Sequence, residues 1–319
     1  MVIFLVDRDH TKTLSAVTRT RLPCEIRVHS FEWALQQKTL PRATYVFTDM
    51  ERMDVWQQTV LAKLFIHIQQ AGPGYRALNN PAAIGDRGAL LRKLHDQGLN
   101  DFNAYRVTEN RWPARYPAFV RRMSMHTKPV TPLLHTQQAL QDALGELLQS
   151  GEAQSDLLII EYCAQPVAEN LYRKLSSFKI GATVFFTHTV HDIKWLVKHG
   201  RKNSATPELY QEELDMILDN RFSGHLSQVF DIAGVEYGRV DFGIVDGRVQ
   251  VYEINTNPFV SLPGHHPNPI RVQSKKIAWE KYVESLVRID TTDRKAPAAS
   301  RFEHPQLQRK WRGVQIKRP

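Results

Sequence analysis

The chain has 319 residues and a formal net charge of +9, with 42% hydrophobic and 24% charged residues. This balance predicts a globular protein with a buried core and room for two or three subdomains. No stretch approaches the roughly 18 apolar residues of a membrane span, and the opening MVIFLVDRDH reaches charged residues too soon for a signal peptide. Cys24 and Cys163 match no zinc or redox spacing, so we expect reduced thiols, a cytoplasmic location and no membrane partner.

Most of the positive charge lies at the C-terminal end. Residues 291–319 contain eight basic and two acidic side chains, a net charge of +6, which leaves +3 for the preceding 290 residues. A basic tail on a nearly balanced body is usually a solvated terminus, and less often an arm for RNA or an anionic surface. We therefore expect a flexible tail at 291–319 and no nucleic-acid partner.

Alternating strand and helix patterns at the start of the chain predict a small parallel sheet. Residues 2–6 are an apolar run typical of a buried strand, and the alternation continues to a strand at 45–47. Residues 53–70 have the pattern of a long amphipathic helix, which the breakers at 72–74 end.

The rest of the chain is expected to be α+β. A turn at 79–81 precedes a helix that begins near Asp86. We then expect elements in the following order: a strand from 118, a loop at 123–132, a helix at 136–150, a strand at 157–162, a strand at 178–186, a helix around 207–230 and a hairpin.

The most informative segment is that hairpin, YGRVDFGIVDGRVQVYEINTNP at 237–258, with a strong turn signal at Asp-Gly. Side chains alternate across a strand. Arg239 and Asp241 therefore share one face of the first strand, and Glu253 and Asn255 share one face of the second. The length of the turn decides whether the two polar rows lie on the same side.

The sequence of this hairpin allows two turn lengths. A two-residue turn at 246–247 would pair Asp241 with Tyr252 and leave the second polar row on the opposite face. A three-residue turn at 245–247, with its glycine left-handed in a bulge, would pair Asp241 with Val251 and bring both polar rows to one side. Only this register also joins the apolar rows, so we expect the three-residue turn.

On one face, Asp241, Glu253 and Asn255 would offer hard oxygen donors suited to Mg²⁺, or to Mn²⁺, bridging nucleotide phosphates. Arg239 beside them could contact a transferring phosphoryl group. The alternative is a strand pair with a salt-bridged outer face. The Asn-Thr-Asn-Pro sequence that follows Glu253 favours the metal site.

GRVDF and EINTNP resemble the end of the ATP-grasp core, as in D-alanine–D-alanine ligases, glutathione synthetases and related carboxylate-amine ligases. The resemblance implies an α+β protein with the ATP-grasp fold, in which two α+β subdomains grip ATP, preceded by a small α/β domain. It implies that Asp241, Glu253 and Asn255 hold Mg-ATP and that Arg239 lies near the acyl phosphate. The similarity extends upstream, with gaps, to about Asn79.

Upstream segments are similar to nucleotide-binding parts of the same family. NNPAAIGDRGALLRKLHDQGLNDFNAYRV resembles the entry into the ATP-grasp domain, and YPAFVRR resembles the strand that presents a basic residue to the phosphates. Arg87 and Arg121 occur where many members have lysine. The loop after this strand, MSMHTKPV, would be the lid, although it lacks the glycines usual in the family.

LLIIEYC resembles the hinge strand that binds adenine through its backbone. This places Glu161, Tyr162 and Cys163 at the base. ENLYRKLSSFKIGATVFF, followed by Trp195 and Lys198, resembles the strand pair beyond the hinge. There the resemblance implies that Glu169 reaches the ribose, that Lys174 binds phosphate and that Arg173 serves catalysis beside Arg239.

The loop after EINTNP faces the acceptor in related ligases, so His265, His266 and Arg271 are the candidate substrate-binding residues. Adjacent histidines cannot easily share one metal ion, which favours a loop role. His188 and Trp195 are expected to follow a strand and to be packed or hydrogen-bonded.

We expect an N-terminal α/β domain at 1–78 and an ATP-grasp domain at 79–290, with a lid subdomain at about 105–162 and a core at 163–290. The expected function is a Mg-ATP-dependent, ADP-forming ligase that joins a small-molecule carboxylate to an amine or another nucleophile through an acyl phosphate. The alternative is an ATP-grasp phosphotransferase, or an ATP-binding protein without ligase activity.

Overall fold

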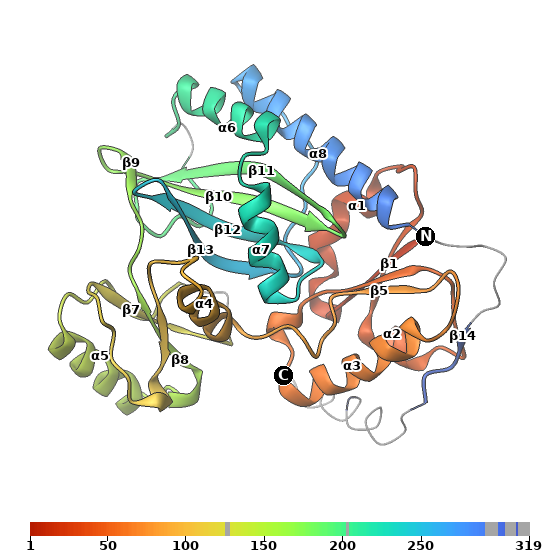
Figure 1. Ribbon diagram of the computed structural model, residues 1–319, viewed down its shortest axis with the longest axis horizontal. Helices are drawn as coiled ribbons and strands as arrows, with labels where there is room; N and C mark the ends of the chain where they lie inside the picture. Colours follow the sequence, from red (N-terminus) through yellow and green to blue (C-terminus); the bar gives the residue numbers. More distant parts are fainter. Residues whose placement is uncertain (125–127, 202–203, 291–298, 304–310, 312–319) are drawn as a thin grey trace.

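A computed structural model describes residues 1–124, 128–201, 204–290, 299–303 and 311 (Figure 1). Within these residues the strands form a parallel sheet near the N-terminus, a three-stranded sheet, a five-stranded sheet and one short strand pair. We call the first three the N-terminal sheet, the small sheet and the large sheet. Among the described helices, none combines the length and the apolar character that crossing a membrane requires.

The N-terminal sheet confirms the predicted parallel arrangement, with strand order β2 (Ile26–Ser30), β1 (Val2–Val6), β4 (Thr44–Phe47) and β5 (Arg76–Leu78). All five residues of β1 are buried, as expected for a parallel strand covered on both faces. The accompanying helices are α1 (Ser15–Arg19), α2 (Phe31–Gln36) and α3 (Val55–Gln69), with 3₁₀ turns η1 (Arg8–Leu14) and η2 (Met50–Arg52). The helix predicted at 53–70 is α3, and a reciprocal capping box of Asp54 and Gln57 begins it.

The small sheet has the order β6 (Ala104–Arg106), β8 (Leu157–Glu161) and β7 (Ala118–Arg122), all antiparallel. Helix α5 (Gln137–Gln149) packs on it through Leu140 and Leu144, and η3 (Val107–Glu109) and η4 (Gln154–Asp156) lie in its connections. Helix α4 (Arg87–Asp96) precedes the sheet and is capped by Asp86, as predicted. Part of the loop predicted as the lid, residues 125–127, lies outside the described residues.

The large sheet has the order β11 (Thr183–Asp192), β10 (Leu171–Ile180), β12 (Tyr237–Val245) and β13 (Arg248–Asn255), and β9 (Pro166–Ala168) pairs with β10. Figure 1 shows α7 (Ser223–Ala233) against one face, while α6 (Pro207–Asp219) and α8 (Pro269–Ile289) lie beside each other near β11. The apolar side chains of this sheet that face α7 continue the core of the N-terminal sheet.

Two sequence predictions were wrong about element number. The single strand at 178–186 is two strands, because Gly181, at a φ of +60°, turns the chain between β10 and β11. The single helix around 207–230 is α6 and α7, because Asn220 ends α6 in the left-handed conformation at a φ of +49°.

The flexible tail was also a wrong prediction for the described part of 291–319. Strand β14 (Ala299–Ser300) pairs with β3 (Thr39–Leu40), Phe302 is buried, and Trp311 is 3% exposed within the core of the N-terminal sheet. The Trp311 Nε1–H donates to Glu32 Oε1 at 3.0 Å.

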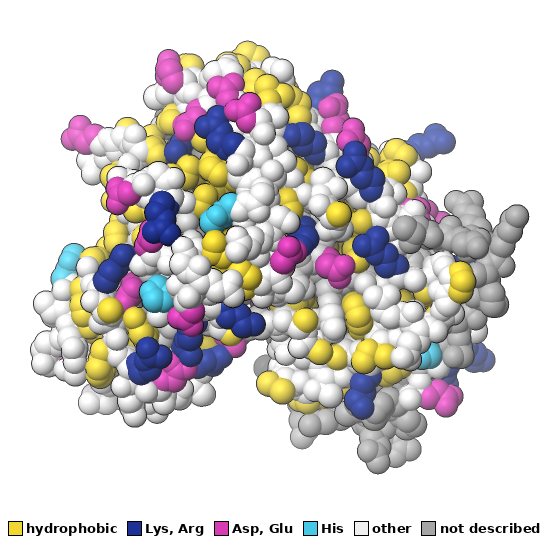
Figure 2. All heavy atoms as spheres, in the orientation of Figure 1, with side chains coloured by type: hydrophobic (Ala, Val, Ile, Leu, Met, Phe, Trp, Pro, Cys, Tyr) yellow, Lys and Arg dark blue, Asp and Glu magenta, His cyan; other side chains and the backbone are white. Residues whose placement is uncertain are grey.

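Over the face seen in Figure 2, basic and acidic side chains are interspersed.

Candidate active site

The hairpin of β12 and β13 has a two-residue turn, so the predicted three-residue turn was wrong. Val245 pairs with Arg248, and Asp246 and Gly247 have φ values of +49° and +78°, as a type I′ turn requires. The extra residue lies instead in β13, where a bulge leaves Tyr252 unpaired between Val251 and Glu253. The extra residue in the bulge brings Glu253 to the same face as Asp241.

Because of the bulge, the predicted polar face is present with different partners. Asp241 lies opposite Glu253, and Arg239 lies opposite Asn255. Ser176 lies opposite Asp241 in the regular pairing of β10 with β12, and a second bulge, between β10 and β11, leaves Ser176 opposite His188 as well. The two bulges thus align His188, Ser176, Asp241 and Glu253 in one row across the large sheet.

Asp241 is the most strongly held carboxylate of this row. It is 1% exposed and accepts hydrogen bonds from Ser176 Oγ, Lys174 Nζ and Arg239 Nε, each at 2.9 Å. Burial by itself would raise the pKa of Asp241, but the charges of Arg239 and Lys174 outweigh it and hold that pKa well below its usual range. Asp241 is therefore an anion at neutral pH.

Glu253 pairs with Arg87, the first residue of α4. Burial raises the pKa of Glu253, but the positive charges of Arg87, Arg121 and Lys174 together outweigh it and lower that pKa. Arg121 on β7 faces the same carboxylate, and burial together with the nearby Arg87 lowers the pKa of its guanidinium to about 10. The two arginines predicted to bind phosphate thus converge on Glu253 from α4 and the small sheet.

The donor set fits Mg²⁺ bound together with phosphate oxygens. Among the described residues, no three His, Cys, Asp or Glu side chains are grouped as a self-sufficient metal site. Asp241 and Glu253 are directly paired across the strands, and Asn255 follows on the same face. Mg²⁺ is commonly bound by one or two carboxylates with substrate phosphates and water completing its shell, and a pair of this kind suffices.

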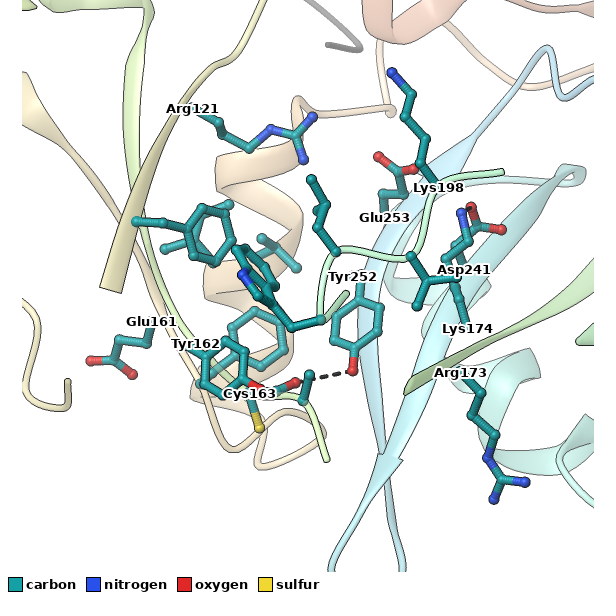
Figure 3. Close-up of a pocket in the computed structure, with 18 residues that line it drawn as sticks. Arg121, Glu161, Tyr162, Cys163, Arg173, Lys174, Lys198, Asp241, Tyr252 and Glu253 are labelled. Atoms are coloured by element: carbon teal, nitrogen blue, oxygen red, sulfur yellow. Dashed lines mark hydrogen bonds and ion pairs between the residues drawn. The ribbon is translucent and has the colours of Figure 1, made fainter. Parts of the chain in front are cut away.

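A cavity of about 140 Å³ lies beside these carboxylates, between the small and large sheets (Figure 3). One half is apolar and aromatic, and the other half is charged. The apolar half is lined by Leu91, Phe102, Phe119, Ile160, Tyr162, Trp195, Leu196, Val197 and Tyr252. The charged half is lined by Arg121, Lys174, Lys198, Asp241 and Glu253. Such a cavity suits a ligand with a planar apolar end and an anionic end.

Residues 161–164 cross the wall of the cavity and join the small sheet to the large one. The Tyr252 hydroxyl donates to the Cys163 carbonyl at 3.0 Å. Trp195 packs its ring against Phe119 and Tyr162, with centroid separations of 5.0 and 5.4 Å. The bulge residue of β13 thus connects the strand that carries Glu253 to this crossing segment.

No family model and no curated protein sequence matches the chain. Its structure is similar to that of the D-alanine–D-alanine ligase from Coxiella burnetii, with a TM-score of 0.50 and 13% identity over 99% of each chain. The same enzyme from Bacillus anthracis aligns with a TM-score of 0.48 and 12% identity, over 91% of this chain and 98% of that one. The chain has the ATP-grasp fold. The fold predicted from the hairpin segment is thereby confirmed.

Within the ATP-grasp fold, several predicted residues lie at the cavity and others do not. Arg121, Glu161, Tyr162, Cys163, Arg173, Lys174, Asp241 and Glu253 line it. Arg87 and Arg239 reach it through their ion pairs with Glu253 and Asp241. Asn255 continues the polar face one step beyond the lining residues.

Glu161 lies at the cavity, where a backbone contact with the base stays a prediction, and its side chain has a structural role. Figure 3 shows it pointing away from the other labelled residues. Its carboxylate accepts hydrogen bonds from the Tyr105 hydroxyl and from the backbone amides of Asn103, Ala114 and Arg115. Glu161 therefore braces the small sheet, and only its backbone is available to the cavity.

Glu169 and the substrate candidates lie outside the cavity. Glu169 is exposed in the turn between β9 and β10 and is not among the residues that line the cavity. His265 is exposed, and His266 contacts the Tyr210 ring. Arg271, on the first turn of α8, pairs with buried Glu213 and donates to the Thr189 carbonyl at 3.2 Å.

Arg173 and His188 also differ from expectation. Arg173 lines the cavity but extends away from the carboxylates to pair with Glu212 on α6. His188 lies within β11 and not after it, on the polar face, and donates to or accepts from Thr187 Oγ1 at 3.0 Å. Burial, followed by the charges of Arg239 and Arg271, lowers the pKa of His188 to about 3, so its ring is neutral at pH 7.

Sequence reasoning missed Ser176 and Tyr252 as site residues. Two adjacent serines in the middle of a strand that is otherwise apolar, aromatic or basic were the available signal for Ser176. Simple alternation along β13 would put Tyr252 on the face opposite Glu253, and only the bulge turns it to the side of Glu253. Gly243 pairs with Gln250 but lies close to the Tyr252 side chain, and a glycine within a strand is the local signal for such a close approach.

Gly243→Ala is expected to weaken nucleotide binding about 10-fold, through roughly 1–2 kcal/mol of lost hydrogen bonding and packing. An added Cβ would lie 2.2 Å from the Tyr252 hydroxyl oxygen and 2.9 Å from Cζ, so the ring must leave the Cys163 carbonyl. Calorimetric titration with ADP measures the effect. Gly145→Ala in α5, where a Cβ meets nothing within 4 Å, is the control and should bind as the parent does. Equal affinities in both variants would contradict the role of Tyr252.

Proposed function

We propose that the chain is a Mg-ATP-dependent, ADP-forming ligase that activates a small-molecule carboxylate as an acyl phosphate and transfers it to an amine or a similar nucleophile. The observation that carries the proposal is the directly paired carboxylates of Asp241 and Glu253 at the charged end of a cavity whose other end is aromatic. The ATP-grasp fold is consistent with this chemistry but does not specify it.

The cavity lining supports a specific placement of ATP. The base would occupy the apolar half, where Phe119, Trp195 and Tyr252 offer aromatic surfaces and the backbone near Cys163 offers hydrogen-bonding groups. The phosphates would extend toward Lys174 and Arg121. The large and small sheets would then hold the nucleotide between them, because each supplies residues to both halves.

Asp241, Glu253 and Asn255 would hold the metal ion, Mg²⁺ or Mn²⁺. Bound there, the ion would offset the negative charge of the phosphoryl group being transferred. Lys174 and Arg239 currently neutralise Asp241, and both are long enough to turn toward phosphate oxygens when the metal replaces them at that carboxylate. In this proposal Arg239 stabilises the charge that develops during transfer.

The proposed reaction has two steps that balance. A carboxylate oxygen of the acceptor attacks the γ-phosphorus of ATP. The bond between the γ-phosphorus and the oxygen that bridges it to the β-phosphate breaks, and ADP leaves. The nucleophile then attacks the acyl carbon, phosphate departs, and the amine loses a proton to give the amide. Arg173 on β10, Arg271 on the first turn of α8, and His265 and His266 in the loop that precedes α8 remain the candidates for contacts with the anionic substrates.

Trapping with hydroxylamine tests the proposal. The protein, Mg-ATP and a pool of small carboxylates are incubated with hydroxylamine, which captures acyl phosphates as hydroxamates, and products are identified by mass spectrometry. We expect hydroxamate and ADP in equal amounts, and neither with the Asp241→Asn variant. Release of AMP, or a stable phosphorylated alcohol without hydroxamate, would contradict ligation and favour a phosphotransferase.

A further inference from the structure

The polypeptide leaves the metal-binding strand directly into contacts with the N-terminal sheet. Asn255 is the last residue of β13, and the next two residues, Thr256 and Asn257, are 1% and 9% exposed. Their side chains are bound by residues more than 200 positions earlier in the sequence. These contacts therefore belong to neither strand of the hairpin.

Thr256 is held by the turn that follows β4. Its backbone amide donates to both carboxylate oxygens of Glu51, at 3.2 and 3.3 Å, and its hydroxyl donates to Glu51 Oε2. The hydroxyl oxygen also accepts from the Met50 amide at 2.9 Å. Every polar group that Thr256 directs toward the N-terminal sheet is thus used within one short turn.

Asn257 is held by the same turn and by the loop after β1. Its Nδ2 donates to Asp49 Oδ2 at 2.9 Å, and its Oδ1 accepts from Thr13 Oγ1 at 2.7 Å. Asp49 adopts the left-handed conformation at a φ of +58°, which a non-glycine residue adopts at some cost. Asp49 is 1% exposed and also accepts from the Asp7 amide at 3.0 Å, so the strained turn is fixed from several sides.

The clasp, defined as Asp49, Glu51, Thr256 and Asn257, adjoins the carboxylate pair. Glu51, Thr256 and Arg87 line one small cavity of about 50 Å³, and Arg87 is the partner of Glu253. Movement of Thr256 would be transmitted to Asn255 by the peptide bond and to Glu253 along the same strand. The clasp therefore fixes the end of the metal-binding strand against a different sheet.

We infer that Glu51, acting through Thr256, is a positioning residue that orients Asn255 and Glu253 for the metal ion, so that docking of the N-terminal sheet is coupled to the metal site. This inference rests on the proposed function. Neither Glu51 nor Thr256 touches the nucleotide in that proposal. Partners that orient metal ligands typically contribute about 10- to 100-fold to metal affinity, which sets the scale of the effect.

The test measures the Mg²⁺ requirement of nucleotide binding, using ADP and the non-hydrolysable analogue AMP-PNP in calorimetric titrations. Thr256→Val removes the hydroxyl while keeping the volume, and Thr256→Ser keeps the hydroxyl. We expect Thr256→Val to raise the half-saturating Mg²⁺ concentration about 10-fold, with the nucleotide affinity in EDTA unchanged within about two-fold. Thr256→Ser should stay within about three-fold of the parent. Glu51→Ala and Glu51→Gln form a second pair with the same expected order.

Asn79→Ala is the matched control at the same interface. Asn79 is fully buried, and its contacts do not involve Thr256. Its Nδ2 donates to the Phe47 and Tyr237 carbonyls, and its Oδ1 accepts from the Glu236 and Tyr237 amides. The Asn79→Ala substitution should lower the melting temperature without changing the Mg²⁺ concentration that nucleotide binding requires. The inference is overturned if folded Thr256→Val needs no more Mg²⁺ than the parent, or if Asn79→Ala needs as much as Thr256→Val. A parent protein that binds no nucleotide in a Mg²⁺-dependent manner would overturn the proposed function as well.

Discussion

Asp241→Asn is expected to lower nucleotide turnover by about 1,000-fold and to remove the Mg²⁺ dependence of nucleotide binding, while the fold is retained. The asparagine preserves the volume and the hydrogen bond from Ser176 but loses the charge that a divalent ion needs. It also leaves Lys174 and Arg239 without their shared anion, so both cations would repel the metal. Calorimetric titration with Mg-ADP, and ADP release in a coupled assay, measure the two effects.

Protonation of Asp241 cannot remove this negative charge from the parent protein near neutral pH. The folded-state pKa of Asp241 lies below the roughly 3.9 of an unfolded aspartate, so its stabilising contribution is complete above that value. The contribution is lost only as the pH falls through the depressed folded-state pKa. Asp241 therefore stays negatively charged at neutral pH, where the assay is run.

Asp219→Asn is the matched control, because Asp219 is exposed on α6 and pairs only with exposed Arg221 among the described residues. Exposed pairs of this kind contribute little, so both binding and turnover should equal those of the parent. Turnover in Asp241→Asn at the level of Asp219→Asn, with its Mg²⁺ dependence intact, would contradict the metal-site assignment.

The sequence was sufficient to predict the polar face of the hairpin but not the way in which the chain forms it. Parity requires one extra residue somewhere between Asp241 and Glu253. The prediction placed it in the turn, whereas Asp246 and Gly247 close a tight two-residue turn and Tyr252 is the extra residue. Alternation along a single strand determines that a bulge or a longer turn is needed, but the choice depends on what the bulged side chain contacts.

Those contacts come from distant segments, which explains most of the missed residues. Tyr252 is turned to the polar face toward the Cys163 carbonyl, 89 residues earlier in the chain. Ser176 donates to Asp241 because β10 and β12 pair these two residues directly, in a register that joins positions 65 residues apart. Glu161 was placed correctly along its strand, yet its side chain is taken by four donors from other segments, and no local pattern could show this.

Trp311→Ala is expected to reduce the free energy of unfolding by about 3–5 kcal/mol, the usual cost of removing a buried aromatic side chain. The Trp311 ring is 3% exposed and packs edge-on against Phe31 and Trp56, with centroid separations of 6.0 and 5.6 Å. Its Nε1–H is the donor to Glu32, which is itself buried, so the substitution also leaves that carboxylate without this partner. Urea unfolding followed by circular dichroism measures the change.

Trp112→Ala is the control, because Trp112 is 39% exposed and the same substitution should cost less than about 1 kcal/mol there. Nucleotide binding by Trp311→Ala should equal that of the parent at temperatures where it is folded, since Trp311 does not line the cavity. Equal unfolding midpoints for the two tryptophan variants would restore the original expectation of a solvated tail. A large difference would mean that the chain is fastened to the N-terminal sheet at Trp311, which the basic charge of this segment does not indicate.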